Sequence, residues 1–178
     1  MVGASALALL AAHPARAQTA ITPDSQPGVG TGTTATTAGT ITAIDGGRRV
    51  GDNLFHSFTS FSLGTGDSAV WVRSGGDGGS IANVINRVTG GTISTIDGTI
   101  ATQGLDRANF FFINPAGIIF GTNASVAVPN AAYFSTANTL RFADGGVFGV
   151  TTPSGSTFSM AAPSAFGFLG ARGDITVR

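Results

Sequence analysis

The chain lacks cysteine, lysine and glutamate, and each absence removes a class of function. Without cysteine there is no disulfide framework and no thiolate to act as nucleophile or metal ligand. Without lysine and glutamate, all nine basic residues are arginine, all nine acidic residues are aspartate, and only 10% of the residues are charged. The formal net charge is zero and no basic stripe occurs, so the composition argues against nucleic acid as a partner.

The missing lysine and glutamate are both good helix formers, and long apolar runs are scarce. Thr, Val, Ile, Phe and 27 glycines dominate in their place, which favours strands and turns over helices. No run reaches the roughly 18 apolar residues that a membrane-spanning helix needs, so we expect no stable membrane insertion. The low charge and positive mean hydropathy are not typical of disorder. A length of 178 residues therefore predicts one all-β domain.

The first residues have the pattern of a secretion signal. Residues 2–12 are an apolar run of Ala, Leu and Val, and Pro14 and the triplet Ala15-Arg16-Ala17 follow it. An apolar segment before a small-x-small triplet predicts a signal peptide over residues 1–17, cleaved after Ala17. Residues 18–178 are then the predicted exported domain.

Short apolar runs recur about every ten residues between turn signals such as Asp45-Gly46 and Asp97-Gly98. The predicted strands are 40–44, 53–58, 69–72, 81–88, 92–96, 109–113, 118–120, 125–128, 132–135, 139–142, 147–150, 166–169 and 175–177. Residues 18–39 are rich in Thr, Gly and Pro, and we expect an extended lead-in without a packed element. A weak repeat between residues 40–46 and 92–98 suits stacked coils, with a sandwich or open barrel as the alternative.

Four blocks of sequence occur in a fixed order. The first is the aromatic block Asn53, Phe55, Phe58 and Phe61; then come 81–98, 109–121 with the motif Asn114-Pro115-Ala116-Gly117-Ile118, and 123–145. In this order they resemble the amino-terminal secretion domain of filamentous haemagglutinins and haemolysins, the cargo proteins of two-partner secretion. The resemblance covers about residues 22–170.

The resemblance implies a right-handed parallel β-helix with extra-helical strands and an amino-terminal cap. It also implies a function: the domain is recognised in the periplasm by the docking domains of a partner outer-membrane transporter, which exports the cargo to the cell surface or medium. We expect a monomer without cofactor, forming the amino-terminal part of a longer exported protein.

The motif at residues 114–118 has two interpretations. Pro fixes φ, Gly supplies positive φ and the Asn amide can satisfy backbone groups, so the motif reads as a structural turn. The alternative is direct contact with the transporter. Ala116 departs from the family, where Asn is common, and the earlier Asn-Pro-Asn-Leu motif of founding members is missing. For the aromatic block, we favour burial in the core and cap over an exposed contact patch.

The sequence offers no catalytic or metal-binding residues. His56 is the single histidine after residue 17, no Gly-x-Ser-x-Gly occurs, and the aspartates are scattered at turns. Two other functions compete with the secretion domain. One is a self-contained surface adhesin. The other is a pectate-lyase-like enzyme with a charged group drawn from Asp52, Asp67, Arg73, Arg87 and Arg107, although no spacing supports that grouping.

Overall fold

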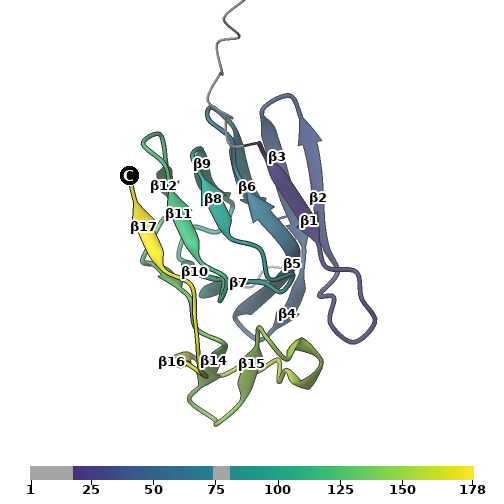
Figure 1. Cartoon of the computed structure of the whole chain (residues 1–178). Coiled ribbons are helices and arrows are strands. Elements are labelled where there is room, and N and C mark those ends of the chain that lie inside the picture. Colours follow the sequence, from purple (N-terminus) through teal and green to yellow (C-terminus); the bar gives the residue numbers. More distant parts are fainter. Residues whose placement is uncertain (1–17, 74–80) are drawn as a thin grey trace, which may run out of the picture.

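Strands make up almost all of the regular structure. The computed structural model describes residues 18–73 and 81–178. Within these ranges lie strands β1 to β17 and one 3-10 turn, Pro153–Gly155, and no α-helix (Figure 1). The prediction of an all-β protein is confirmed.

Sheet A is the central sheet of the domain. Its strands are β1 (Ala20–Pro23), β5 (Asn53–Ser62), β7 (Asn83–Val88), β10 (Asn109–Ile113) and β13 (Ala132–Ser135), with β4 (Arg48–Val50) beside β5. The strands β5, β7, β10 and β13 are parallel, whereas β1 and β4 run antiparallel to β5.

Three further sheets surround it. Sheet B contains β2 (Thr33–Ala38), β3 (Ile41–Gly46), β6 (Ser68–Val72), β9 (Thr99–Gln103) and β12 (Ser125–Ala127). Sheet C contains β8 (Ser94–Ile96), β11 (Ile118–Phe120) and β17 (Ile175–Val177). Sheet D is antiparallel and contains β14 (Thr139–Phe142), β15 (Val147–Gly149) and β16 (Pro163–Gly167).

Successive strands of the chain belong to sheets B, A and C in a repeated order. The order is β6, β7, β8, then β9, β10, β11, then β12 and β13, with sheet D inserted before β17. The first round, β3 and β5, reaches sheet C through a bridge from Leu63 to Ile96. Neighbouring rounds pair in parallel, but β1, β2 and β4 pair antiparallel with the first round, so the sheets are mixed.

The main hydrophobic core contains side chains from sheets A, B and C. Its aromatic centre joins Trp71 edge-on to Phe110, with ring centroids 4.8 Å apart, and Phe61 to Phe112 at 5.0 Å. Trp71 Nε1 donates a hydrogen bond of 2.8 Å to Asn86 Oδ1, so the indole N–H is satisfied in the core.

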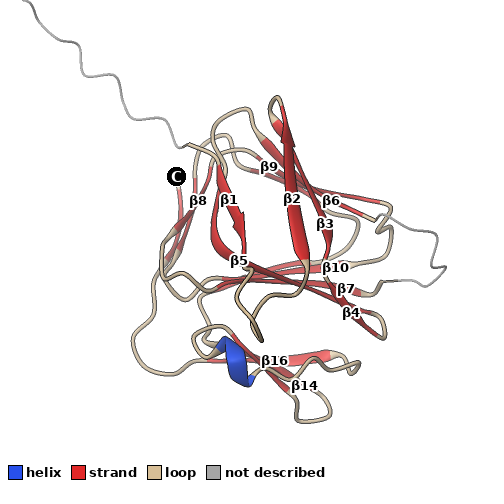
Figure 2. Ribbon diagram, turned by 90° about the vertical axis from the view of Figure 1, so that its right-hand side faces the viewer, coloured by secondary structure: helices blue, strands red, loops and turns tan. Residues whose placement is uncertain are grey.

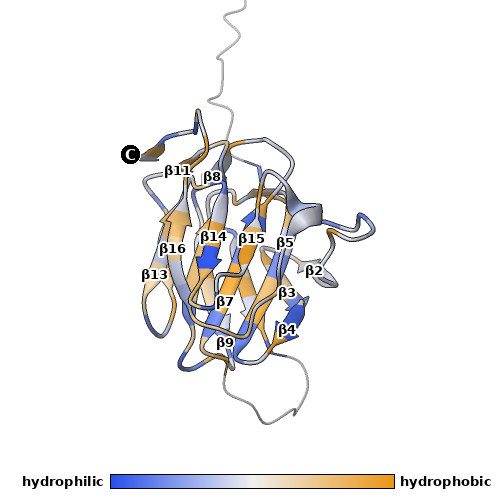
Figure 3. Ribbon diagram, turned by 90° about the horizontal axis from the view of Figure 1, so that it is seen from below, coloured by the Kyte–Doolittle hydropathy of each residue, from blue (hydrophilic) through white to orange (hydrophobic). Residues whose placement is uncertain are grey.

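A second core lies on the opposite face of sheet A, where sheet D covers it (Figures 2 and 3). Phe55 packs there against Phe142 and Phe148, with centroids 5.9 and 5.0 Å away. All six residues of β7 are consequently buried. This two-sided cover explains why the sequence of β7 does not alternate apolar and polar residues.

The prediction that residues 18–39 form an extended lead-in without a packed element is wrong. Residues 18–39 contain β1 and β2, and Asp24, Val29 and Thr33 are buried. The physical reason is pairing across the chain: the threonines of β2 are β-branched, and the strand pairs antiparallel with the whole of β3. Local turn signals gave no indication of this partner.

An asparagine ladder crosses three strands of sheet A. Asn53, Asn83 and Asn109 share one register line. Asn109 Nδ2 donates to Asn83 Oδ1 at 3.1 Å and Asn83 Nδ2 to Asn53 Oδ1 at 2.8 Å. Asn53 Nδ2 then donates to the carbonyls of Ser159 and Ala161 at 2.8 and 2.7 Å. The ladder therefore ties the segment between β15 and β16 of sheet D to β5.

Replacing the middle of the ladder tests its contribution. Asn83→Ala leaves Asn53 Oδ1 and Asn109 Nδ2 without their partner, and we expect a loss of about 2 kcal/mol in the free energy of unfolding, measured in urea. The matched control is Asn130→Ala at an exposed position, where we expect a change within about 0.5 kcal/mol. Equal losses in the two variants would contradict the ladder.

Candidate functional site: a braced motif turn and a buried guanidinium

The motif turn, residues 114–117, joins β10 to β11, and Asn114 is completely buried within it. Asn114 Nδ2 donates to the carbonyl of Thr92 at 2.8 Å and to Ser94 Oγ at 2.9 Å, in the segment that forms the previous round. Its Oδ1 accepts the backbone N–H of Ala116 at 3.0 Å. The carboxamide is thus fully used in bracing backbone and a neighbouring hydroxyl.

Main-chain bonds hold the same turn from three directions. The N–H of Asn114 donates to the carbonyl of Ser135 at 2.9 Å, and the N–H of Gly117 donates back to Asn114 at 3.1 Å. The carbonyl of Gly117 accepts from the N–H of Ser94 at 3.0 Å. Gly117 has a φ of 124°, which L side chains rarely adopt, so glycine suits this position.

Residues 173 and 174 cover the outer side of the turn. The N–H of Gly173 donates to the carbonyl of Pro115 at 2.7 Å, and the N–H of Ile118 donates to the carbonyl of Asp174 at 3.0 Å. A Cβ on Gly173 would lie 2.1 Å from the carbonyl oxygen of Ala116. Of the motif, Pro115 and Ala116 are half-buried and the rest is buried.

The predicted aromatic block is buried and divided between the two faces of sheet A. Phe58 and Phe61 pack edge-on at 5.4 Å in the main core, while Phe55 faces sheet D. Asn53 is the end of the asparagine ladder. None of the four side chains is exposed to a partner in this fold.

Arg87 is a fully buried cation in β7 that sequence reasoning did not single out as structural. Its Nε donates to Ser57 Oγ at 2.8 Å, its Nη2 to the carbonyl of Val29 at 2.7 Å, and its Nη1 to the carbonyl of Gly149 at 2.6 Å. Nη1 also donates to Ser156 Oγ at 2.6 Å. The guanidinium lies over the ring of Phe148, 4.3 Å from its centroid.

Charge near Arg87 comes from Asp24, which is also buried. Asp24 Oδ2 accepts from Thr89 Oγ1 at 2.8 Å and from Ser57 Oγ at 3.4 Å, so Ser57 lies between the carboxylate and the guanidinium. Burial lowers the pKa of Arg87 to about 10, and the negative charge of Asp24 opposes that shift. Arg87 therefore stays charged at neutral pH.

His56 is buried between β2 and the main core. Its Nδ1 lies 3.1 Å from Thr33 Oγ1, and its Nε2 has no hydrogen-bond partner among the described residues. Burial lowers the pKa of His56 from 6.5 to about 3, while the charge of Asp45 opposes the shift. The imidazole is consequently neutral in the folded protein at neutral pH.

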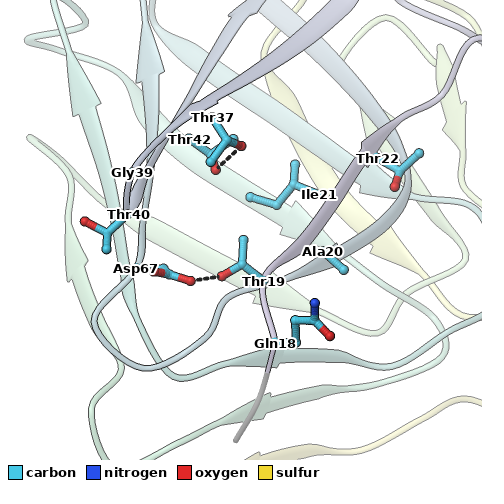
Figure 4. Close-up of a pocket in the computed structure, with 10 residues that line it drawn as sticks. All are labelled: Gln18, Thr19, Ala20, Ile21, Thr22, Thr37, Gly39, Thr40, Thr42 and Asp67. Atoms are coloured by element: carbon cyan, nitrogen blue, oxygen red, sulfur yellow. Dashed lines mark hydrogen bonds between the residues drawn. The ribbon is translucent and has the colours of Figure 1, made fainter.

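A groove of about 500 Å³ lies beside β1 and is lined by hydroxyl groups (Figure 4). Thr19 Oγ1 donates to the carboxylate of Asp67, and the hydroxyls of Thr37 and Thr42 lie 2.9 Å apart. Asp67 is the one titratable residue of the lining. With threonine hydroxyls and a single carboxylate, and no histidine in the lining, the groove offers no recognisable catalytic arrangement.

The structure does not bring together the charged residues that were considered above for a pectate-lyase-like enzyme. Arg87 is enclosed beneath sheet D, whereas Asp67 faces the groove beside β1. Across residues 18–73 and 81–178, no cluster of three or more His, Cys, Asp or Glu could hold a metal ion. In the same ranges, no helix is long and apolar enough to cross a bilayer. The predicted cleavage residues Ala15 and Ala17 lie outside the described residues.

The fold and the site define an all-β module whose buried polar side chains brace backbone and other side chains. A family model of the TPS secretion domain matches residues 19–175, and the chain belongs to this family. The resemblance found in the sequence is confirmed. The chain thus carries a two-partner secretion cargo domain, the domain of a secreted protein whose export involves an outer-membrane transporter. A comparison with curated proteins finds no match.

Removing the guanidinium tests whether Arg87 joins the layers. Arg87→Met leaves the carbonyl of Val29 buried without its donor, leaves that of Gly149 with only the 3.3 Å bond from Ser156 Oγ, and removes the charge opposite Asp24, so we expect the free energy of unfolding to fall by about 3 kcal/mol or more. The control is Arg141→Met in β14, where the arginine is exposed and the expected change is within about 0.5 kcal/mol. Similar urea midpoints for the two variants would show that Arg87 is dispensable.

The buried histidine predicts a loss of stability in mild acid. The unfolded chain binds a proton at His56 near pH 6.5, but the folded chain does so only near pH 3, so stability falls as pH decreases through that window. Between pH 7 and pH 5 we expect a loss of about 2 kcal/mol, measured by urea unfolding. His56→Gln should remove most of this dependence, and an unchanged slope in that variant would refute the assignment to His56.

Proposed function

We propose that residues 18–178 are the export signal of a filamentous-haemagglutinin-like exoprotein. After removal of residues 1–17, the domain is recognised in the periplasm, as a monomer, by the docking domains of a partner outer-membrane transporter. The transporter then moves the cargo to the cell surface or the medium. The observation that carries this proposal is the family match over residues 19–175, which spans every strand from β1 to β16 and reaches the first residue of β17.

We further propose that the fold is a right-handed parallel β-helix with extra-helical strands and an amino-terminal cap. The repeated order of sheets B, A and C supports it, as do the parallel register lines that run through Ile41, Ser68, Thr99 and Ser125. On this assignment β1, β2 and β4 form the cap and sheet D is the extra-helical layer.

In this proposal, the motif at residues 114–118 is a structural turn that the transporter does not contact directly. The support is the burial of Asn114 and the use of both ends of its carboxamide inside the fold. A surface contact would need an accessible side chain, and only Pro115 and Ala116 are partly accessible.

The export role is tested by fusing the complete chain to an inert periplasmic passenger. We expect the passenger to appear outside the cell only when the cognate transporter is co-expressed, and the purified domain to bind the transporter's periplasmic domains. Release without the transporter, or no binding to those domains, would remove the proposal and favour a self-contained adhesin.

The role of the motif is tested with Asn114→Ala. The variant loses two donated bonds and one accepted bond in a buried turn, so we expect the free energy of unfolding to fall by about 1–3 kcal/mol. Affinity for the transporter's periplasmic domains, measured on the same purified protein, should decrease together with the melting temperature. Gly117→Ala should behave alike, because alanine at positive φ costs about 1 kcal/mol or more.

The control is Asn130→Ala, for which both measurements should stay near those of the unmodified chain. A variant of Asn114 that melts normally and no longer binds would replace the structural interpretation with direct recognition.

A further inference from the structure

Three Asp-Gly pairs lie within the described residues: Asp45-Gly46, Asp97-Gly98 and Asp144-Gly145. The sequence predicts a turn at each pair, but the structure holds the three carboxyl groups differently. In the first pair, the N–H of Gly46 donates to Oδ1 of Asp45 at 2.7 Å, at an exposed position. The carboxyl group of Asp45 therefore lies against the nitrogen of the peptide bond that follows it.

The other two carboxyl groups are bound elsewhere. Asp97 accepts a hydrogen bond from the hydroxyl of Thr65. Asp144 accepts from the N–H of Gly146 at 2.9 Å and from Ser159 Oγ at 2.6 Å. In both cases the side-chain hydroxyl lowers the pKa of the carboxyl group below its ordinary value and so favours the ionised form. Among the bonds of the described residues, neither carboxylate accepts from the glycine N–H that directly follows it.

The fold requires glycine at position 46 and leaves its N–H at the end of the ladder. Gly46 has a φ of 68°, and a Cβ there would lie 2.3 Å from the carbonyl oxygen of Gly32. A larger residue would clash with backbone, so the nitrogen has no side chain beside it to shield it. The pairing of β3 with β6 ends at Ile44, opposite Trp71, and the N–H of Gly46 turns to the carboxyl group of Asp45.

Water can reach this peptide bond. A pocket of about 150 Å³ is bordered by Asp45, Gly46 and Gly47, and Gly46 itself is exposed. Reaction at a peptide nitrogen requires solvent to take up its proton, and hydrolysis requires a water molecule. The Asp45-Gly46 peptide thus combines a close carboxyl group, an unshielded nitrogen and access to water.

We propose that Asp45 is a site of spontaneous isomerisation to isoaspartate. The nitrogen of Gly46 attacks Cγ of the protonated carboxyl group of Asp45. The new N–Cγ bond closes a five-membered succinimide, and the displaced oxygen leaves as water after taking up the amide proton. Water then opens the ring at the main-chain carbonyl carbon of Asp45, so that the peptide bond continues through Cγ. The water lost is regained, and no other reactant is needed. Reactions within one molecule are accelerated when the reacting atoms are held about 3–3.5 Å apart.

Isomerisation adds a methylene group to the main chain at the end of β3. Gly46 lies opposite Thr33 of β2, and the N–H of Gly47 donates to the carbonyl of Gly32 at 3.2 Å. The close contact of Gly46 with Gly32 leaves no room for a longer chain, so β2 and β3 must separate at this end. Thr33 Oγ1, which lies 3.1 Å from His56 Nδ1, moves away with β2. The change thereby loosens the amino-terminal strand pair without cleaving the chain.

The first measurement follows the complete, folded chain during several weeks at neutral pH. Isoaspartate has the same mass as aspartate, so it is located by electron-transfer fragmentation, which breaks the altered main chain at a characteristic bond. We expect isoaspartate at residue 45 to exceed that at residues 97 and 144 by about tenfold or more. In the urea-unfolded chain the three pairs lose their different contacts, and the excess should disappear. Equal accumulation in the folded chain, or an excess at residue 45 that persists in urea, would overturn the proposal.

Asp45→Asn and Asp144→Asn form a matched pair of variants, because asparagine reaches the same succinimide by releasing ammonia. The folded Asp45→Asn chain should lose its amide about tenfold faster than the Asp144→Asn chain. Asp45→Glu is the control that should give no isomer at residue 45, since glutamate would have to close a six-membered ring. Similar rates in the two asparagine variants would contradict the role of the fold.

The structural consequence is measured on the isoaspartate fraction, separated from the unmodified chain by chromatography. We expect the amide hydrogens of β2 to exchange faster in this fraction, whereas those of β10 should exchange at unchanged rates. Unchanged exchange in β2 would show that the longer main chain is accommodated and would contradict the loosening of the strand pair.

Discussion

Burial of the Arg87 guanidinium is the constraint on which the layered arrangement depends. An unpaired cation in the interior would cost many kcal/mol, so its donors must meet acceptors that the fold brings to it. Those acceptors come from distant parts of the chain: Val29 before β2, Ser57 in β5, and Gly149 at the end of β15. Arg87 can be satisfied only when the lead-in, the central sheet and sheet D are all in place. The bond pattern of this one residue thus couples the two hydrophobic cores.

The other buried polar side chains follow the same rule on a smaller scale. Asn53 binds carbonyls of the segment between β15 and β16 of sheet D. Asn86 links Trp71 to the carbonyl of Phe111, and Asn114 links the motif turn to the previous round. Each carboxamide has one donor group and one acceptor, so it can join two neighbours that no backbone ladder connects. This use of polar residues accounts for a core rich in asparagine that holds no catalytic group among the described residues.

The sequence predicted the strands best where the pattern was local. The bounds of β10, β11, β13, β14 and β17 match the predicted ones, because each strand is a short β-branched or aromatic run between turn residues. β1, β2, β4 and β9 were missed, since these segments become strands only by pairing with β5, β3 and β6. The sequence shows Arg87 within the apolar run 81–88. Its hydrogen bonds to backbone carbonyls could not be predicted, because carbonyl partners have no sequence signature. The same limit hid Gly173, whose necessity arises from one backbone carbonyl.

The departure of Ala116 from the family pattern can be understood from the turn itself. The bonds that brace the turn come from the carboxamide of Asn114 and from main-chain groups, and residue 116 contributes only its backbone N–H and carbonyl. Alanine supplies both as well as asparagine does, so the turn keeps its conformation. Residue 116 is half-buried, and its backbone carbonyl lies against Gly173, so it meets the segment before β17 through its main chain. Because these contacts use backbone groups that every residue other than proline supplies, the turn and its contact with Gly173 do not require asparagine at position 116.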